Sequence, residues 1–173
     1  MTRRWLLLPL VSIAALALGA CSSETAVSPL APSAPSMARR ATALPFHGTL
    51  DAVETGQFQP ATNRVLVHLE GTGTATHLGR YTLVADFIVN PVAHTVVGTL
   101  VLTAADGATL TATATGQATP LPNGIRAAVE TATITGGTGR LAGATGSFVI
   151  ERTLTLATGV SSGSFDGVIN LGK

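Results

Sequence analysis

From residue 46 to the C-terminus, apolar and polar residues alternate with a period of two, and segments rich in Gly, Pro, Asn and Asp interrupt the alternation at short intervals. This pattern is typical of strands in an antiparallel sheet, because successive side chains of a strand point to opposite faces. We expect eight strands, at 46–54, 64–71, 80–89, 95–104, 109–116, 126–135, 147–157 and 164–171. The sequence therefore predicts an all-β domain.

The stretch ATLTATATGQAT, residues 108–119, argues against helices in a chain that is otherwise rich in alanine. It interleaves alanine with β-branched threonine, and a helix could not sort this period onto one face. Short connections make strands that are neighbours in sequence also neighbours in space. Eight such strands can close into an up-and-down antiparallel β-barrel, which has no unpaired edges and whose interior holds its own side chains or one small ligand.

The alternation also predicts which side chains face the interior and which face outward. The segments YTLVADFIV (81–89) and VVGTLVL (96–102) are apolar on both faces, which indicates that the outer wall is covered as well. We therefore expect a homo-oligomer that packs on these strands. The expected lining of the lumen is Phe46, Leu50, Val67, Leu83, Phe87, Leu110, Ile150 and Phe165.

The N-terminus has the pattern of a bacterial export signal. Arg3 and Arg4 precede an apolar stretch from Trp5 to Leu18, which is too short for a spanning helix. The segment Leu18-Gly19-Ala20-Cys21 resembles the lipobox of bacterial lipoproteins, and Cys21 is the only cysteine. The resemblance implies cleavage after residue 20 and acylation of Cys21 with a diacylglycerol and a further fatty acid such as palmitate.

We therefore divide the chain into a signal peptide (1–20), a lipidated cysteine with a Pro-, Ser- and Ala-rich tether (21–43) and a barrel domain (44–173). The expected location is the periplasmic side of a membrane in the cell envelope. Ser22 favours the outer membrane under the sorting rule of enteric bacteria. The chain has ten basic and nine acidic side chains, and removal of the leader takes away two arginines. The mature protein thus lacks the basic excess of a nucleic-acid-binding protein.

Five glycines cluster between the sixth and seventh expected strands, at 136, 137, 139, 143 and 146. Residues 137–142 fit the loose nucleotide-binding form G-x-G-x-x-A, but a strand follows instead of a helix and too few residues remain for a parallel sheet. We therefore interpret Gly136, Gly137, Gly139, Gly143 and Gly146 as a structural corner where one strand leaves the sheet and the next returns.

This glycine segment, GGTGRLAGATG, is similar to the G-T-G-x-F-x-x-A-x-G loop of the dirigent and allene oxide cyclase barrels, with Leu141 where those families carry phenylalanine. The stretches GTGTATHLGRYT (71–82) and GSFDGVI (163–169) resemble those of small bacterial relatives. The resemblance implies an eight-stranded antiparallel barrel, often trimeric, with a mostly apolar lumen. Plant members guide a radical coupling or a cyclisation, and none of their catalytic residues can be matched to a motif here.

The classical catalytic and metal-binding patterns find little support. Ser161 lies in the form G-x-S-x-G, but no histidine follows it in the chain, and we interpret GVSSG as a polar hairpin turn. The four histidines, at 47, 68, 77 and 94, have no metal-ligand spacing. We therefore expect no metal, no cofactor and no catalytic residue that can be named.

One pair of charges is expected among apolar neighbours. Glu130 shares a face with the apolar residues of 128–134, and Arg152 with those of 148–156. If the glycine loop is centred on Leu141, Ile134 lies opposite Phe148 and Glu130 opposite Arg152. The pair is either a structural salt bridge or a site at which Arg152 orients a carboxylate or carbonyl ligand, with Glu130 as counter-ion or base.

Three functions remain open for a membrane-anchored barrel of this kind. The first is binding of a small apolar ligand in the lumen. The second is a structural or interaction lipoprotein with a filled barrel. The third is an isomerase or cyclase of the dirigent or allene oxide cyclase type. A cavity in the lumen favours ligand binding, and a filled lumen favours a structural or interaction role. A cavity with Glu130 and Arg152 at its floor leaves an isomerase or cyclase possible.

Overall fold

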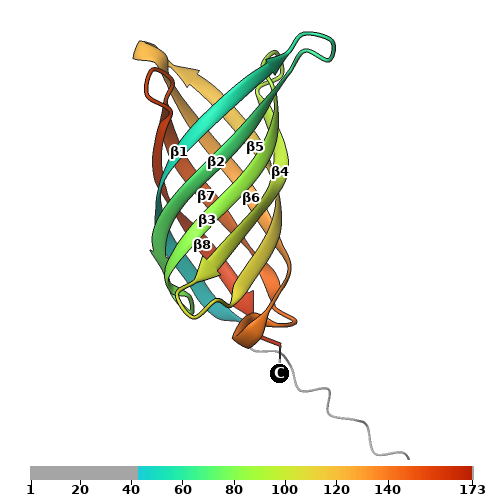
Figure 1. The fold of residues 1–173 in the computed structure, drawn as a ribbon, viewed down its shortest axis with the longest axis vertical. Coiled ribbons are helices and arrows are strands. Elements are labelled where there is room, and N and C mark those ends of the chain that lie inside the picture. The colour runs from blue at the N-terminus through green and yellow to red at the C-terminus, as the bar shows by residue number, and fades with distance from the viewer. Residues whose placement is uncertain (1–42, 173) are drawn as a thin grey trace, which may run out of the picture. The chain divides into compact units, whose positions relative to one another are not determined.

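The chain folds into one closed barrel of antiparallel strands, in a computed structural model that describes residues 43–172 (Figure 1). Its strands are β1 (Leu44–Gln59), β2 (Arg64–Ala75), β3 (Gly79–Asn90), β4 (Thr95–Ala104), β5 (Thr109–Leu121), β6 (Ile125–Gly137), β7 (Thr145–Thr155) and β8 (Val160–Asn170). Two short 3₁₀ turns, η1 (Pro122–Gly124) and η2 (Gly139–Leu141), lie on either side of β6. The predicted all-β fold class is confirmed.

Each strand pairs with the next one along the chain, and β8 pairs with β1 to close the sheet. The predicted up-and-down order is therefore confirmed. We call the end that carries the β1–β2, β3–β4, β5–β6 and β7–β8 connections the mouth. The opposite end, which carries the other three connections, η2 and the start of β1, is the closed end. In Figure 1 the mouth is at the top and the closed end at the bottom.

The alternation along each strand sorts side chains between the lumen and the outer wall. In β5, Ala112 and Ala114 are buried, whereas Thr113 and Thr115 between and beside them are exposed. The same period places phenylalanines, leucines and isoleucines of the other strands in the interior. Because an eight-stranded barrel is only just wide enough for side chains, small alanines on one strand make room for large residues on the strands across the lumen.

Most strands extend beyond their predicted bounds, although β4 has the bounds predicted for it. β1 continues to Gln59, and β8 begins at Val160 instead of residue 164. For β8 the reason is that Gly163, which belongs to the stretch GVSSG that we interpreted as a turn, lies within the ladder. Gly163 pairs with Arg152, and a Cβ at Gly163 would lie 2.6 Å from the Cβ of Arg152. This glycine is needed for close approach between strands, not for a turn.

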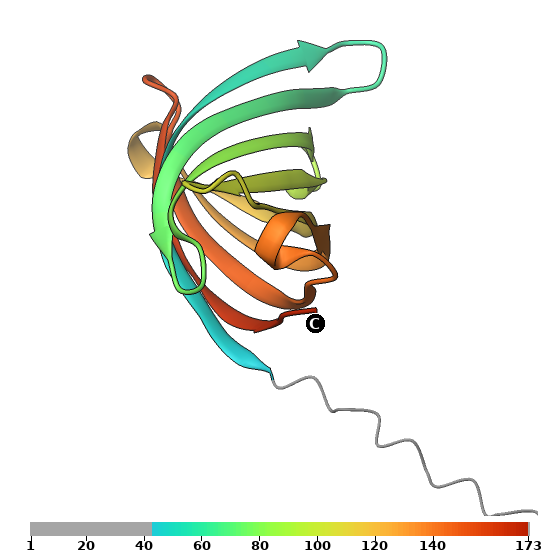
Figure 2. The same ribbon diagram turned by 60° about the horizontal axis from the view of Figure 1, so that its bottom comes forward.

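The glycine segment forms a cap over the closed end of the barrel. Its turn η2 places Leu141, which is fully buried, against the interior. Figure 2 brings this end forward and shows η2 lying over it. Arg140 holds the cap in place, because its Nε donates to Asp106 Oδ2 at 2.6 Å and its other nitrogens donate to the carbonyls of His77 and Leu78. The segment that we interpreted as a structural corner therefore also covers one end of the barrel.

The predicted register of β6 against β7 is wrong by two residues. Ile134 lies opposite Gly146, so the hairpin is centred on Arg140 and not on Leu141. Glu130 consequently lies opposite Ile150, and Arg152 lies opposite Ala128. The cap is asymmetric, since β6 runs on to Gly137 while β7 begins at Thr145. A hairpin centre cannot be read from the glycine positions when a 3₁₀ turn lies on one side of the loop.

The described residues contain all eight strand pairings and the whole core cluster. Residues 44–172 of the barrel domain thus carry every strand pairing that closes the barrel. No helix within residues 43–172 is long and apolar enough to cross a membrane. The signal peptide, Cys21 and nearly all of the tether lie outside the described residues.

Candidate ligand site in the barrel lumen

All the residues predicted to line the lumen lie on the inward face of their strands. Seven are buried, and Val67 on β2 is half-buried and packs against the core from the mouth side. The seven buried residues are Phe46, Leu50, Leu83, Phe87, Leu110, Ile150 and Phe165. These residues do not line one continuous cavity, because the two halves of the lumen differ in how completely side chains fill them.

The half of the lumen near the closed end is filled. The rings of Phe46, Phe148 and Phe165 form a cluster with centroids 5.0–5.1 Å apart. Tyr81 lies beside Phe165, and its hydroxyl donates to the carbonyl of Thr49 at 2.9 Å. Burial raises the pKa of Tyr81 well above its ordinary value, so this hydroxyl stays a donor. The remaining void has about 20 Å³, little more than a water molecule needs.

The half near the mouth leaves a cavity of about 300 Å³. Its apolar side chains come from β2–β7 and the connections that follow β3 and β7, and are Val65, Val67, Phe87, Val89, Pro91, Val96, Ala118, Ala128, Leu154 and Leu156. Three charged side chains, Glu54, Arg126 and Arg152, also line it. A concave apolar surface with a few polar groups is the usual form of a small-molecule site.

The floor of this cavity is a buried ion cluster centred on Arg152. Its Nε donates to Glu130 Oε2 at 2.9 Å, and its Nη2 donates to Glu130 Oε1 at 2.7 Å. Its Nη1 donates to Glu54 Oε1 and to Ser161 Oγ, the latter at 3.0 Å. The guanidinium also lies 5.6 Å from the ring centre of Phe87. Arg152 and Phe87 line both the cavity above and the small void below, so they separate the two halves of the lumen.

The cluster is almost closed to solvent. The side chains of Arg152 and Glu54 are each 6% exposed, and that of Glu130 is fully buried. Burial by itself lowers the pKa of Arg152, but the hydrogen bonds and charges of Glu130 and Glu54 outweigh it and raise the pKa above its ordinary value. Arg152 therefore stays protonated, and its hydrogen bonds go to the protein's own acceptors.

The ion pair predicted from sequence thus lies inside the barrel, although through a diagonal contact and not through the direct pairing that we expected. A long arginine side chain can reach a residue two places away on the neighbouring strand. The cluster has two further members, Glu54 and Ser161, which were not predicted to lie there. Glu54 is an even number of residues from Phe46 and Leu50 in β1, and Ser161 is an even number from Phe165 in β8. The alternation along these strands therefore indicated that both side chains face the lumen.

The interpretation of GVSSG as a hairpin turn is wrong. Ser161 lies within β8, is fully buried and accepts a hydrogen bond from Arg152. The turn is formed by the preceding residues, where the N–H of Gly159 donates to the carbonyl of Thr155 at 2.9 Å. Among residues 43–172 the side-chain hydrogen-bond partner of Ser161 is Arg152, so its hydroxyl helps to orient the guanidinium.

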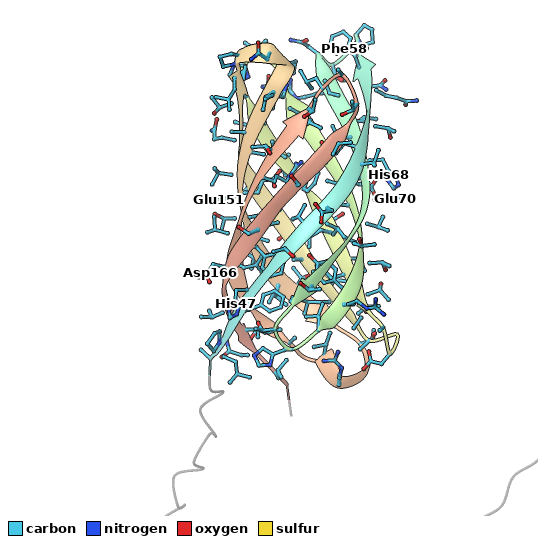
Figure 3. All side chains as sticks on the ribbon, turned by 90° about the vertical axis from the view of Figure 1, so that its left-hand side faces the viewer. His47, Phe58, His68, Glu70, Glu151 and Asp166 are labelled. Carbon is cyan, nitrogen blue, oxygen red and sulfur yellow. The ribbon has the colours of Figure 1, made fainter. Side chains whose placement is uncertain are left out.

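The histidines lie apart from the lumen. His68 is on the outer wall of β2, where its ring nitrogens lie 2.8 Å from Asp86 Oδ1 and 3.4 Å from Glu70 Oε1 (Figure 3). The hydrogen bond to Asp86, followed by that to Glu70, raises the pKa of His68. His77 and His94 lie in turns with positive φ. Within residues 43–172, no group of three or more His, Cys, Asp or Glu side chains is arranged to hold a metal ion.

Comparison with known proteins identifies the fold. No family model matches the sequence, and no curated protein sequence is significantly similar to it. Among solved structures, the pterocarpan synthase dirigent protein PsPTS1 has a TM-score of 0.57 at 13% identity, over 76% of this chain and 97% of that one. The pterocarpan synthase dirigent protein GePTS1 has a TM-score of 0.55 at 14% identity, over 83% of this chain and 100% of that one. The chain therefore has the barrel fold of the dirigent proteins, as its glycine segment led us to expect.

Proposed function

On this dirigent-type barrel, we propose that the chain binds a small apolar ligand in the mouth half of its lumen. The observation that carries the proposal is the cavity of about 300 Å³, lined by aliphatic side chains and closed below by the Arg152 cluster. Its volume is at the lower end of the range of about 300–1,000 Å³ found for ligand sites. The filled closed half supplies the rigid support that such a site needs.

The binding of 1-octanol tests this proposal. We expect isothermal titration calorimetry to give saturable binding of one octanol to each barrel domain, because the chain of the alcohol replaces water against the aliphatic lining. The variant Val67→Trp puts a bulky ring into the cavity and is expected to lose binding. The matched control, Val168→Trp, places the same ring on the outer wall of β8, where Val168 is 43% exposed, and is expected to retain binding. Equal loss in both variants, or equal binding in both, would contradict the proposal.

Catalysis in the same cavity is the second candidate. A buried carboxylate and a buried guanidinium meet at its floor, and the two similar solved structures are named as pterocarpan synthases. The groups at this floor differ from our expectation, since Glu54 and not Glu130 lines the cavity. We propose binding first because it needs only the cavity, whereas an isomerase or cyclase also needs a group that moves a proton or charge on the substrate.

We further propose that the barrel assembles into a homo-oligomer through the outer wall of β2–β4. A patch of exposed apolar side chains lies there in two rows: Leu66, Ile88 and Val97 in one, and Val84 and Val101 in the other. These residues are 37–52% exposed. A polar row, His68, Asp86 and Thr99, lies between the two apolar rows. Exposed apolar side chains flanked by polar ones are typical of interfaces, and we expect the occupant to be a second copy because the resemblance implies a trimer.

Sedimentation velocity of the barrel domain at micromolar concentration tests the assembly. We expect an oligomer for the wild type and a monomer for the double variant Ile88→Lys and Val97→Lys, because each lysine would have to lose its hydration in the interface. The control is Val149→Lys with Val168→Lys, which changes two similarly exposed valines on β7 and β8. This variant is expected to keep the oligomer, and a wild type that sediments as a monomer would rule the interface out.

We also propose that the protein is a lipoprotein anchored through Cys21 and facing the periplasm. The support is the basic start, the short apolar stretch and the small residues before the single cysteine. When the full chain is expressed in a bacterial host with a labelled palmitate analogue, we expect the label on the wild type and none on Cys21→Ala. Label that persists in Cys21→Ala, or that is absent from both proteins, would contradict the proposal of a lipid anchor at Cys21.

A further inference from the structure

The buried cluster at the floor of the mouth cavity does not balance in charge. Arg152 supplies one positive charge, and Glu130 and Glu54 supply two negative ones within hydrogen-bonding distance of it. Ser161 adds a neutral hydroxyl. Because buried charges are costly unless they are paired, a surplus carboxylate inside a barrel calls for a counter-ion.

The surplus lies on Glu54. Both carboxylate oxygens of Glu130 accept hydrogen bonds from Arg152, and Glu130 faces the small void below the cluster. Glu54 accepts from Arg152 through Oε1 alone, and no residue within 43–172 donates to its Oε2. Its side chain is 6% exposed and lines the cavity of about 300 Å³. A half-satisfied carboxylate thus faces the space in which we propose that the ligand lies.

The other charged group on the cavity is Arg126, which is half-buried at the mouth end of β6. It makes no ion pair with any carboxylate of residues 43–172. The two ends of the cavity therefore differ in charge: the cluster at the floor has a net negative charge, and Arg126 at the rim is positive. An anionic head at the floor would add a third negative charge around one guanidinium, whereas a cationic head would complete the balance.

We propose that the mouth cavity binds a small amphipathic amine, with its ammonium group on Glu54 and its apolar body along the aliphatic lining. This inference rests on the proposed ligand-binding function and adds the chemical class of the ligand. The charge-assisted hydrogen bond between an ammonium and the free oxygen of Glu54 is short and strong, since the site is shielded from water. Residues 44–173 contain five arginines, one lysine and eight acidic residues, so the domain as a whole also attracts cations.

The cavity also limits the size of the amine. At about 30 Å³ for each water-sized group, 300 Å³ holds a ligand of about ten non-hydrogen atoms. Octylamine, which is an ammonium ion at neutral pH, fits this limit. 1-Octanol and octanoate have the same chain length with a neutral and an anionic head, so the three compounds differ in the charge that meets the floor.

The experiment is calorimetric titration of the barrel domain with these three compounds at pH 7. We expect octylammonium to bind at least about ten-fold tighter than 1-octanol, which is the ratio that a hydrogen bond to a charged group supplies, and octanoate to bind weakest. Glu54→Gln keeps the shape of the side chain, leaves Arg152 paired with Glu130, and is expected to abolish the preference for the amine. The matched control is Arg126→Gln, which removes the charge at the rim of the cavity and leaves Glu54 and Arg152 unchanged. This variant is expected to keep the preference for the amine.

The outcomes separate this inference from the function on which it rests. If octanol binds as tightly as octylammonium, or octanoate binds tightest, the amine class is overturned while the lumen remains a ligand site. If none of the three compounds binds, the ligand-binding function falls and the inference falls with it. A preference for the amine that survives in Glu54→Gln would place the ammonium elsewhere and overturn the role of Glu54. The comparison of the three compounds on the wild type does not depend on how well any variant folds.

Discussion

Replacing Arg152 by methionine is expected to lower the free energy of unfolding of the barrel domain by about 3–5 kcal/mol. Methionine is unbranched and fills much of the same space, so the main change is the loss of the buried positive charge. The variant leaves Glu130, whose side chain is fully buried, without the guanidinium that satisfies both of its oxygens. Urea unfolding followed by circular dichroism measures the loss.

A triple variant tells charge from packing. When Glu130→Gln and Glu54→Gln are added to Arg152→Met, no charge remains in the cluster, and we expect most of the lost stability to return, since neutral amides cost far less to bury. If Arg152→Met unfolds at the same urea concentration as the wild type, the cluster is not the buried structural element described above. If the triple variant is as unstable as the single one, the effect comes from packing and not from charge.

The second large effect is expected at the cap of the closed end. Leu141→Ala should lower the free energy of unfolding by about 2–5 kcal/mol, because it removes a fully buried side chain and leaves a cavity against the interior. Thermal unfolding of the variant measures the change. The same experiment tests the role of the glycine segment, because a loop that only connects two strands would tolerate this substitution.

Leu121→Ala is the matched control for the cap. This leucine ends β5 at the mouth and is 44% exposed, so its truncation is expected to change stability by no more than about 0.5 kcal/mol. A loss at Leu141 no larger than the loss at Leu121 would contradict the account of the cap as part of the core.

The fold could be predicted because the signal for it is local. The period of two fixes which side of each strand faces the lumen, and short turns fix the order of the strands. The alternation of alanine and threonine in β5 alone excluded a helix. The same rule placed every predicted lining residue on the inward face, since parity survives even when the ends of a strand are misjudged.

One error arose where glycine has more than one use. Gly163 lies inside β8, where it gives room to the chain across the ladder, but in sequence it resembles a turn residue. The misreading began β8 too late, and β1 also continues beyond its predicted end. These errors hid Ser161 in an expected turn and left Glu54 as the last residue of a strand that in fact continues.

The complete cluster could not be predicted for a further reason. Glu54 and Arg152 are 98 residues apart and belong to β1 and β7, which are not neighbours in the sheet. Their contact passes over the inner face of β8, which lies between them, and depends on the curvature and tilt of the closed barrel. Pairing rules between adjacent strands reached Glu130 and Arg152, but they carry no information about side chains of strands that are not adjacent.

The most direct test of a ligand site in the lumen is a crystal structure of the barrel domain grown with 8-bromo-1-octanol, whose bromine is located by its anomalous scattering. We predict a bromine peak inside the mouth cavity, among Val67, Val96 and Leu154 and above the guanidinium of Arg152. A peak confined to the outer wall of the barrel, or a mouth cavity filled by the protein's own side chains, would contradict the account.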